Sequence, residues 1–287
     1  MSLVLGSRVF EPSTPVVMAI VNRTPDSFFD AGATFALDAA LARVTQAVKE
    51  GADIVDIGGV RAGSGEHVSV AEELARTAEL VTQVRAAFPR LVISVDTWRA
   101  GVADELCRRG ADLVNDAWAG ADPDLAGVAG RHGVGLVCSH TGGLPPRTDP
   151  HRVAYADVVA DVVASTAALA ERAVAQGVSR DAILVDPTHD FGKNTWHSLE
   201  LTRRLDQVVD SGWPVLVALS NKDFIGETLD LPVQERLYGT LAATAVCAWH
   251  GAQVFRAHDV AATRQVVDMV ASIRGLRPPA RARRGLA

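Results

Sequence analysis

The sequence predicts an α/β protein, a closed (β/α)8 barrel of the TIM type in a single domain. Short apolar runs alternate with longer stretches whose apolar residues recur every three to four positions, and glycines stand where these stretches should stop. The eight apolar runs are 16–21, 53–57, 91–95, 112–115, 134–138, 182–185, 214–219 and 253–256. Strict alternation of strands and helices favours a closed barrel, with an open, doubly wound parallel sheet as the alternative.

The predicted strands are compact apolar runs rather than alternating ones, from VVMAIV at 16–21 to QVFR at 253–256. Such runs are typical of parallel strands that are covered on both faces. Residues 3–10 precede the first run, and we expect them to form a short strand or ribbon that plugs the amino-terminal end of the barrel.

Helices are predicted in the stretches between the strands, which are rich in alanine. They span 36–50, 68–87, 99–109, 122–131, 151–176, 196–210, 231–250 and 260–273. Gly51, Gly133 and Gly251 are among the glycines that mark helix ends. We expect the barrel to occupy 1–275 and the arginine-rich remainder, 276–287, to be a disordered basic tail, with a weak contact to an acidic partner as the alternative.

Charge and cysteine content exclude several functions. The chain of 287 residues has a net charge of −6 with acids and bases interspersed, so we expect no binding to nucleic acid or to anionic membranes. Cys107, Cys138 and Cys247 lie far apart without a C-x-x-C pair, which argues against a disulfide framework or a structural zinc site and fits a reducing cytosol. The start MSLVLGSRVF does not resemble a signal peptide and no apolar stretch is long enough to span a membrane, so we expect a cytoplasmic protein.

Polar residues follow nearly every predicted strand. In a barrel of this kind, ligands bind in the loops at the carboxyl ends of the strands. An acid or amide at a single strand end is often a helix cap, but polar groups at so many ends indicate a site. The polar residues at these ends are Asn22, Thr24, Asp26, Asp96, Asn115, Asp116, His140, Asp186, Ser220, Lys222, Arg256 and His258.

Seven segments at these strand ends closely resemble, in order, the motifs of dihydropteroate synthases. They are NRTPDSFFD at 22–30, GADIVDIGG at 51–59, SVDTWRA at 94–100, GADLVNDAWAG at 110–120, LVDPTHDFGK at 184–193, LSNKDFIG at 219–226 and FRAHDV at 255–260. The resemblance covers nearly the whole chain. That family, in folate biosynthesis, condenses a dihydropterin pyrophosphate with p-aminobenzoate and releases pyrophosphate.

The resemblance implies a pterin pocket at the carboxyl end of the barrel. Asp186 would accept two parallel charge-assisted hydrogen bonds from one edge of the pterin, and Asp96 and Asn115 would bind its remaining polar edge. Lys222 would donate to the carbonyl oxygen or nitrogen acceptors of the ring and is assigned a catalytic role.

The resemblance also implies a separate subsite for pyrophosphate. Arg256 and His258 are two positions apart on the last strand and would point the same way, and a guanidinium suits a phosphate. Both are assigned catalytic roles, because departure of pyrophosphate requires neutralisation of its charge and no protein nucleophile. Asn22 would bind the anion or a Mg²⁺ ion that bridges its oxygens.

The family commonly dimerises through its last helices. We therefore expect a homodimer, with residues 231–273 at the interface. The alternative is that the alanine-rich run at 240–248 packs against its own barrel.

The chain departs from the family pattern where the second reactant would bind. The second loop of the family reads G-G-E-S-T-R-P-G, whereas Ala62 and Gly63 stand here at the threonine and arginine positions. Asn221 replaces the arginine of the S-R-K motif, Asp190 replaces a glycine, and Arg23 replaces a valine. Where the family usually has M-H-M, the chain has Ser139, His140 and Thr141.

We therefore expect a divergent paralogue that retains the pterin pocket and condenses p-aminobenzoate weakly or not at all. Each lost charge-assisted contact is worth roughly 1.5–3 kcal/mol, so loss of two in the transition state would lower the rate by about 10²–10⁴-fold. An active dihydropteroate synthase in which Arg23 or Arg61 compensates is the alternative, with sulfonamide or sulfone analogues of p-aminobenzoate as further ligands. A pterin-binding protein without turnover and a pterin-linked methyl-transfer barrel are two others.

Overall fold

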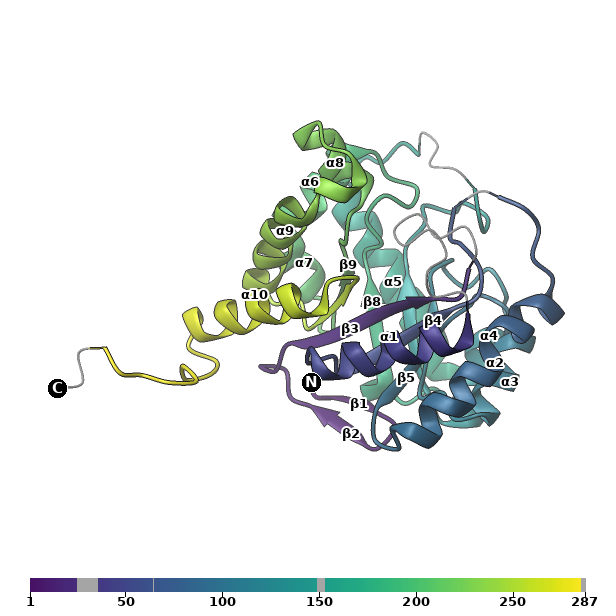
Figure 1. Ribbon diagram of the computed structural model, residues 1–287. Coiled ribbons are helices and arrows are strands. Elements are labelled where there is room, and N and C mark those ends of the chain that lie inside the picture. Colours follow the sequence, from purple (N-terminus) through teal and green to yellow (C-terminus); the bar gives the residue numbers. More distant parts are fainter. Residues whose placement is uncertain (25–35, 64, 149–152, 285–287) are drawn as a thin grey trace.

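Eight parallel strands form a nearly closed barrel in the computed structural model, which describes residues 1–24, 36–63, 65–148 and 153–284 (Figure 1). The strands are β3 (Val16–Asn22), β4 (Ile54–Gly58), β5 (Val92–Asp96), β6 (Leu113–Asp116), β7 (Gly135–Ser139), β8 (Ile183–Asp186), β9 (Leu216–Ala218) and β10 (Val254–Ala257). Their order in the sheet is β8-β7-β6-β5-β4-β3-β10-β9, and a parallel bridge between Val185 and Val215 joins the two edges. The barrel is confirmed, and each strand lies within two residues of its predicted ends.

A hairpin covers the amino-terminal end of the barrel. β1 (Leu3–Leu5) pairs antiparallel with β2 (Arg8–Phe10), and the hairpin lies below the strands in Figure 1. Leu3, Leu5 and Phe10 are buried in one cluster with the inward-facing residues of the strands. The hairpin is therefore the predicted plug, which seals the end of the barrel opposite the candidate site.

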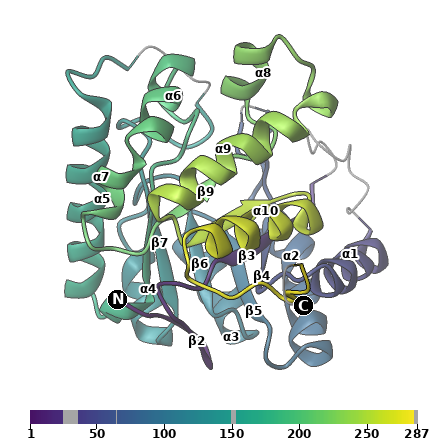
Figure 2. The ribbon, with the colours of Figure 1, turned by 90° about the vertical axis from the view of Figure 1, so that its left-hand side faces the viewer.

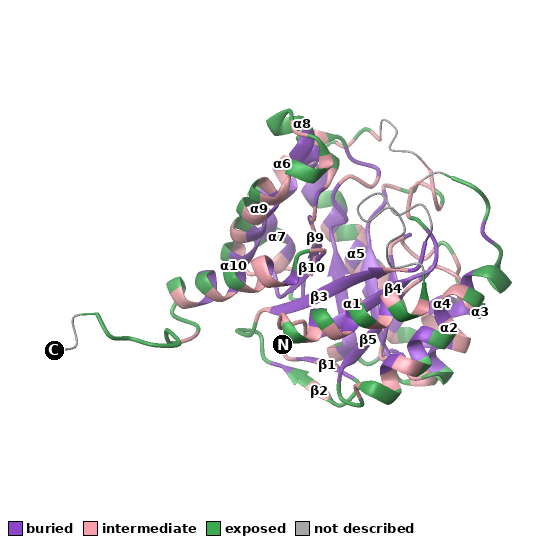
Figure 3. Ribbon diagram, in the orientation of Figure 1, coloured by how far each residue is buried: buried purple, intermediate pink, exposed green. Residues whose placement is uncertain are grey.

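Ten helices cover the outside of the barrel within the described residues (Figure 2). They are α1 (Leu37–Lys49), α2 (Val70–Ala87), α3 (Ala100–Arg108), α4 (Leu125–His132), α5 (Val158–Ala175), α6 (Thr195–Arg203), α7 (Leu205–Val209), α8 (Asp223–Leu229), α9 (Leu237–His250) and α10 (Val260–Ile273). Their apolar faces join the outward-facing residues of the strands in the larger of the two core clusters. Figure 3 shows buried strands inside a shell of helices whose outer faces are exposed.

Two helices were predicted to begin too early, one predicted helix is divided in two, and one helix was missed. The helix expected to span 151–176 begins at Val158, because the side chain of Asp157 caps it by accepting from the N–H groups of Val159 and Ala160. The stretch 196–210 forms two helices that meet at Arg204. The helix expected from 231 begins at Leu237, and α8 was not predicted.

The segment after α10 is irregular and mostly exposed as far as residue 284. Its first part contacts the helices: Arg274 donates to the carbonyl oxygen of Ala248, and Arg277 pairs with Asp268. Disorder of 276–287 stays a prediction, and residues 285–287 lie outside the described residues. Within the part of the chain that the structure describes, no helix is long and apolar enough to cross a membrane.

Candidate functional site

The strand register brings several predicted site residues into one row at the carboxyl end of the barrel. Asn22 of β3 is paired with Gly58 of β4, Gly58 with Asp96 of β5, and Asp96 with Asn115 of β6. Paired residues on neighbouring strands lie about 5 Å apart, so the row is short. A Cβ atom built on Gly58 would lie 3.6 Å from Oδ1 of Asn22 and 3.4 Å from Cβ of Asp96. The glycine thus leaves a gap that both side chains border.

Asp56 lies at the centre of the barrel and was missed as a site residue. Its carboxylate is fully buried and accepts from Oγ of Ser94 at 2.6 Å, from Nδ2 of Asn115 at 3.0 Å and from Nε of Arg256 at 2.6 Å. The three donors belong to three other strands. One signal was available in the sequence: Asp56 is an acid within the apolar run DIVDI, two positions before the glycine pair. A buried acid in such a run requires hydrogen-bond donors or a cation from other parts of the chain.

Arg256 links this buried acid to the predicted pterin acid. Besides its bond to Asp56, its Nη2 atom donates to Oδ2 of Asp96 at 2.8 Å, and its side chain is 17% exposed. We predicted Arg256 as a pyrophosphate ligand. Its guanidinium bonds to two carboxylates, so it holds Asp96 and Asp56 together from the interior of the barrel.

The protonation of Asp96 depends on opposing effects. Burial raises its pKa to about 7, the nearby Arg256 acts in the opposite direction, and Asp56, Glu73 and Asp116 raise it further. The ion pair with Arg256 favours the charged carboxylate. Asp96 therefore changes its charge near neutral pH, and a ligand that donates to it would favour the ionised form.

Asp186 is held by the turn that follows β8. Its Oδ1 atom accepts from the backbone N–H of Thr188 at 2.7 Å, while Oδ2 accepts no hydrogen bond from the described residues. Burial raises the pKa of Asp186, and Lys222 and Lys193 oppose this shift. One carboxylate oxygen therefore stabilises the turn and the other remains available to a ligand.

Lys222 lies beside the same turn. Its Nζ atom donates to the carbonyl oxygen of His189 at 2.5 Å and lies 4.5 Å from the centre of the Phe191 ring. Burial lowers the pKa of Lys222, whereas Asp190 and Asp186 act to raise it. The predicted pterin ligands thus form two groups, Asp96 with Asn115 and Asp186 with Lys222.

The turn after β8 contains left-handed residues where the family pattern has glycine. Thr188 has φ 52° and Asp190 has φ 70°. Aspartate tolerates this region because its side chain can bond locally. The carboxylate of Asp190 accepts from Oγ of Ser198 at 3.0 Å and from the N–H of Phe224 at 3.3 Å. The new acid is therefore bonded to α6 and to the first turn of α8.

His258 and Asn22 occupy neighbouring strand ends. Nδ1 of His258 lies 2.9 Å from Oγ of Ser220, which fixes the imidazole beside the loop after β9. Asn22 offers a single amide oxygen at the border of the gap above Gly58. Within the described residues no group of three or more His, Cys, Asp or Glu could hold a metal. The chemistry fits Mg²⁺ bound by one protein oxygen together with phosphate and water oxygens.

The altered second loop is held by an arginine from another loop. Arg147 donates to the carbonyl oxygens of Gly63 at 3.2 Å and Glu66 at 2.6 Å. A Cβ atom at Gly63 would meet only Nε of Arg61, at 3.7 Å. The position is therefore open, and the Arg61 side chain passes next to it. Ser64 lies outside the described residues.

Two other replaced positions hold buried residues. Asn221 is buried with φ 57°; its N–H donates to Oγ1 of Thr240 and its carbonyl oxygen accepts from Arg236. Arg23 is buried, and burial lowers its pKa. Pro25, Asp26 and Ser27 of the first loop lie outside the described residues.

Comparison with known proteins gives a consistent result. Residues 18–258 match the family described as pterin binding enzyme. The chain is 57% identical to inactive dihydropteroate synthase 2 of Mycobacterium leprae, with full coverage of both chains. It is 36% identical to dihydropteroate synthase of Haemophilus influenzae, over 94% of this chain and 98% of that protein.

Solved structures show the same fold. The Yersinia pestis dihydropteroate synthase in a complex with a sulfonamide drug has a TM-score of 0.90 at 33% identity and covers 96% of this chain and 100% of its own. The Xanthomonas albilineans dihydropteroate synthase in complex with 7,8-dihydropteroate has a TM-score of 0.83 at 34% identity, covering 96% and 99%. The resemblance in the motifs therefore extends to the whole chain.

Proposed function

Because this chain belongs to the pterin-binding enzyme family as a divergent relative of the dihydropteroate synthases, we propose that it binds a pterin or pterin pyrophosphate at the carboxyl end of its barrel and condenses it with p-aminobenzoate weakly or not at all. The observation that carries this proposal is the row of Asn22, Asp96 and Asn115, supported from the interior of the barrel by Asp56 and Arg256.

In this proposal Asp186 and Asp96 bind two different edges of the pterin ring. The free oxygen of Asp186 accepts from one polar edge of the ring, and Lys222 donates to an acceptor beside it. Asp96 and Asn115 bind the opposite edge. Asp96, Asn115 and Asp186 lie at strand ends and Lys222 is the N-cap residue of α8, so all four need little rearrangement to bind.

The pyrophosphate side uses His258, Arg256 and Asn22. Mg²⁺ bound at the Asn22 oxygen would neutralise charge on the leaving group. For Arg256 to take part, pyrophosphate must compete with the two carboxylates that bind it here. His258 is oriented toward this role by its contact with Ser220.

The residues at the positions where p-aminobenzoate would bind are the reason to expect weak or absent condensation. Ala62 and Gly63 carry no polar side chain, and Asn221 is bonded toward α9 through its backbone. The relative from Mycobacterium leprae is named an inactive dihydropteroate synthase, which agrees with this proposal. One observation favours an active synthase as the second candidate: Nε of Arg61 lies close to where a side chain at position 63 would start, so Arg61 could supply the missing cation.

We further propose a cytosolic homodimer. α9 and α10 pack together and expose large apolar side chains: Tyr238 is 83% exposed, Trp249 55%, Met269 61% and Ile273 60%. Large apolar side chains exposed on two helices that pack together are typical of a protein interface. The cysteines within the described residues are buried and free, which agrees with a reducing compartment.

Calorimetry with purified protein tests the pterin site. The probe is 6-hydroxymethyl-7,8-dihydropterin pyrophosphate with Mg²⁺, titrated into the unaltered chain, Asp186→Asn and the exposed control Asp210→Asn. We expect micromolar binding that Asp186→Asn weakens by about 10–100-fold, since a hydrogen bond to a charged group is worth about 1.5–3 kcal/mol. The control should bind as the unaltered chain does.

A turnover assay with p-aminobenzoate separates the two candidates. Binding without product, together with failure to complement a strain that lacks dihydropteroate synthase, agrees with the first. Robust formation of dihydropteroate would establish the second. Absence of pterin binding by a folded protein would refute both.

A further inference from the structure

A cavity of about 490 Å³ lies outside the candidate pterin site, between the segment after β7 and the exposed face of α5. Asp96, Asn115, Asp186 and Lys222 do not line it. Its polar lining residues are Ser139, His140, Thr141, Tyr155, Ser165, Asp161 and Arg172. A cavity of this size with converging polar groups is typical of a small-molecule site.

We propose that this cavity is a second binding site, for a small molecule that has an apolar or aromatic body, a carboxylate at one end and an amine at the other. The inference goes beyond the proposed function, because it concerns a different part of the fold. Three observations support it: Asp161 and Arg172 lie at the two ends of the α5 face, His140 is held in place by hydrogen bonds, and Gly120 leaves room for the Arg172 side chain.

The floor of the cavity is one face of α5. Asp161, Ser165, Ala168 and Arg172 are spaced by three or four positions, so they lie in line along the helix. The acid is near the amino end of this line, the arginine is three turns further on, and Ala168 and Leu169 provide an apolar middle. At 1.5 Å per residue, Asp161 and Arg172 are about 16 Å apart along the axis, and the arginine side chain leans back toward the acid to leave a span on the order of 10 Å.

A glycine makes room for the guanidinium of Arg172. A Cβ atom on Gly120 would lie 2.6 Å from Nη2 of Arg172, and Gly120 has φ 71°. Burial raises the pKa of Asp116 to about 6, and the charge of the exposed Arg172 opposes this shift. A guanidinium held against bare backbone at a cavity wall is suited to a planar carboxylate.

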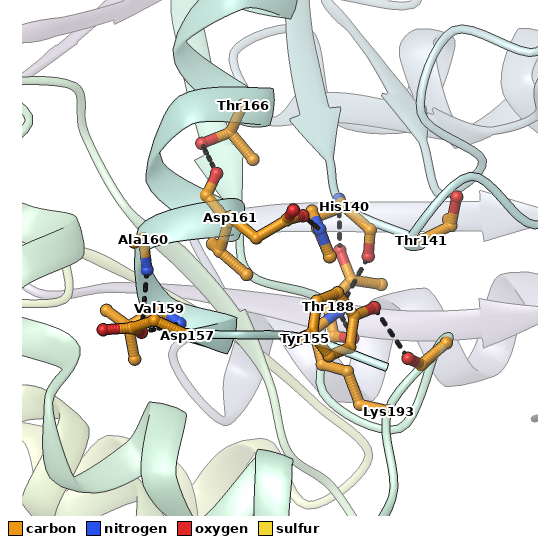
Figure 4. A network of polar contacts seen from close by, with 12 residues as sticks. His140, Thr141, Tyr155, Asp157, Val159, Ala160, Asp161, Thr166, Thr188 and Lys193 are labelled. Carbon is orange, nitrogen blue, oxygen red and sulfur yellow. Dashed lines mark hydrogen bonds and ion pairs between the residues drawn. The ribbon is translucent and has the colours of Figure 1, made fainter. Parts of the chain in front are cut away.

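His140 fixes the acidic end of the cavity. Its Nε2 atom lies 2.7 Å from Oδ1 of Asp161, its N–H donates to Oγ1 of Thr188, and its carbonyl oxygen accepts from Nζ of Lys193 (Figure 4). Burial lowers the pKa of His140 to about 4, so the ring is neutral at pH 7 and donates to Asp161. The Asp161 side chain is 49% exposed, which leaves it able to accept from an amine.

Tyr155 closes one side of this arrangement. Its hydroxyl donates to the carbonyl oxygen of Gly192 at 2.7 Å, and its ring lies 5.8 Å from that of His140. Ser139 and Thr141, which also line the cavity, are short polar residues at positions where the family pattern usually has methionine. The cavity is thus bordered by residues in which this chain departs from that pattern.

The probe that matches this chemistry is 4-(aminomethyl)benzoate, compared with benzoate and benzylamine, which carry one charged end each. Calorimetry or saturation-transfer NMR at pH 7.5 gives the affinity for the full chain. We expect 4-(aminomethyl)benzoate to bind at least tenfold more tightly than either single-ended probe, because both ends of the cavity are then used.

Four variants locate the binding. Arg172→Gln should weaken 4-(aminomethyl)benzoate and benzoate at least tenfold, and Asp161→Asn should weaken 4-(aminomethyl)benzoate and benzylamine. Ala168→Trp fills the middle of the cavity from an exposed position and should abolish binding without unfolding the protein. Arg131→Gln, an exposed arginine on α4, is the matched control and should change nothing.

The Asp186→Asn variant shows whether the probe binds in this cavity or at the barrel mouth. Binding of 4-(aminomethyl)benzoate that survives Asp186→Asn but not Arg172→Gln supports the proposal, whether or not the chain binds pterin. The proposal is overturned if 10 mM probe does not bind, if the folded Arg172→Gln and Ala168→Trp variants bind as tightly as the unaltered chain, or if Asp186→Asn removes the binding.

Discussion

Asp56→Asn is the substitution that tests the interior of the site most directly. Asp56 is fully buried and accepts three hydrogen bonds, from Ser94, Asn115 and Arg256. Asparagine has nearly the same shape but only one accepting oxygen, and its NH₂ group would face one of these donors. The change therefore removes the negative charge that Asp56 presents to Arg256. It also places the new NH₂ group next to one of the existing donors, so that two N–H or O–H groups face each other without an acceptor.

The expected loss of stability can be derived from these contacts. Removing one partner of a buried ion pair costs about 3–5 kcal/mol because the other charge is left buried. Asp96 still binds Arg256 at 2.8 Å, and the arginine side chain is 17% exposed, so we expect the lower end, about 3 kcal/mol in the free energy of unfolding. Pterin affinity should fall at least tenfold as well, because Asn115 and Arg256 lose the carboxylate that orients them.

Urea unfolding followed by circular dichroism, together with pterin calorimetry, measures both effects. Asp112→Asn is the matched control. Asp112 pairs with Arg85 and accepts from the N–H of Ile93 near the amino-terminal end of the barrel. Its substitution should lower stability and leave pterin affinity unchanged. A folded Asp56→Asn variant within 1 kcal/mol of the unaltered chain, with equal pterin affinity, would refute the reasoning.

Four further predictions concern the site and the surface. Burial raises the pKa of Asp96 to about 7, so pterin affinity should rise roughly tenfold from pH 6 to pH 8 as the carboxylate ionises, and calorimetry on Asp96→Asn should show no such rise. Because this pKa lies above the value of about 3.9 in an unfolded chain, the same group should lower the free energy of unfolding as pH rises from about 4 to about 7, a slope that urea titrations of Asp96→Asn should lack. Joint substitution Ala62→Thr and Gly63→Arg should fold normally, since position 63 is open, and should raise dihydropteroate formation above that of the unaltered chain; a folded variant without gain contradicts the loop explanation. Trp249→Glu, on the exposed face of α9, should give a monomer in sedimentation velocity while the exposed control Glu79→Gln remains dimeric.

The strands could be predicted because their signal is local. A parallel strand covered on both faces needs an uninterrupted apolar run, and the sequences of β3 and β8 show such a run. Helix ends were less predictable because they depend on capping side chains and on residues that interrupt a helix. Asp157 starts α5 through bonds that its side chain makes, and Arg204 separates α6 from α7 within a continuous helical pattern.

By itself, the sequence determined the barrel, the plug at 3–10 and the strand ends that carry polar groups, since each depends on neighbouring residues in the chain. Only the tertiary structure decided which of those groups meet. The motif alone did not show that Asp56 receives donors from three other strands. The assignment of Arg256 to pyrophosphate stays a prediction, and only the structure showed that its guanidinium bonds to both Asp56 and Asp96. The physical reason is that burial and pairing of charge depend here on partners 38 to 200 residues away, and no local pattern encodes those partners.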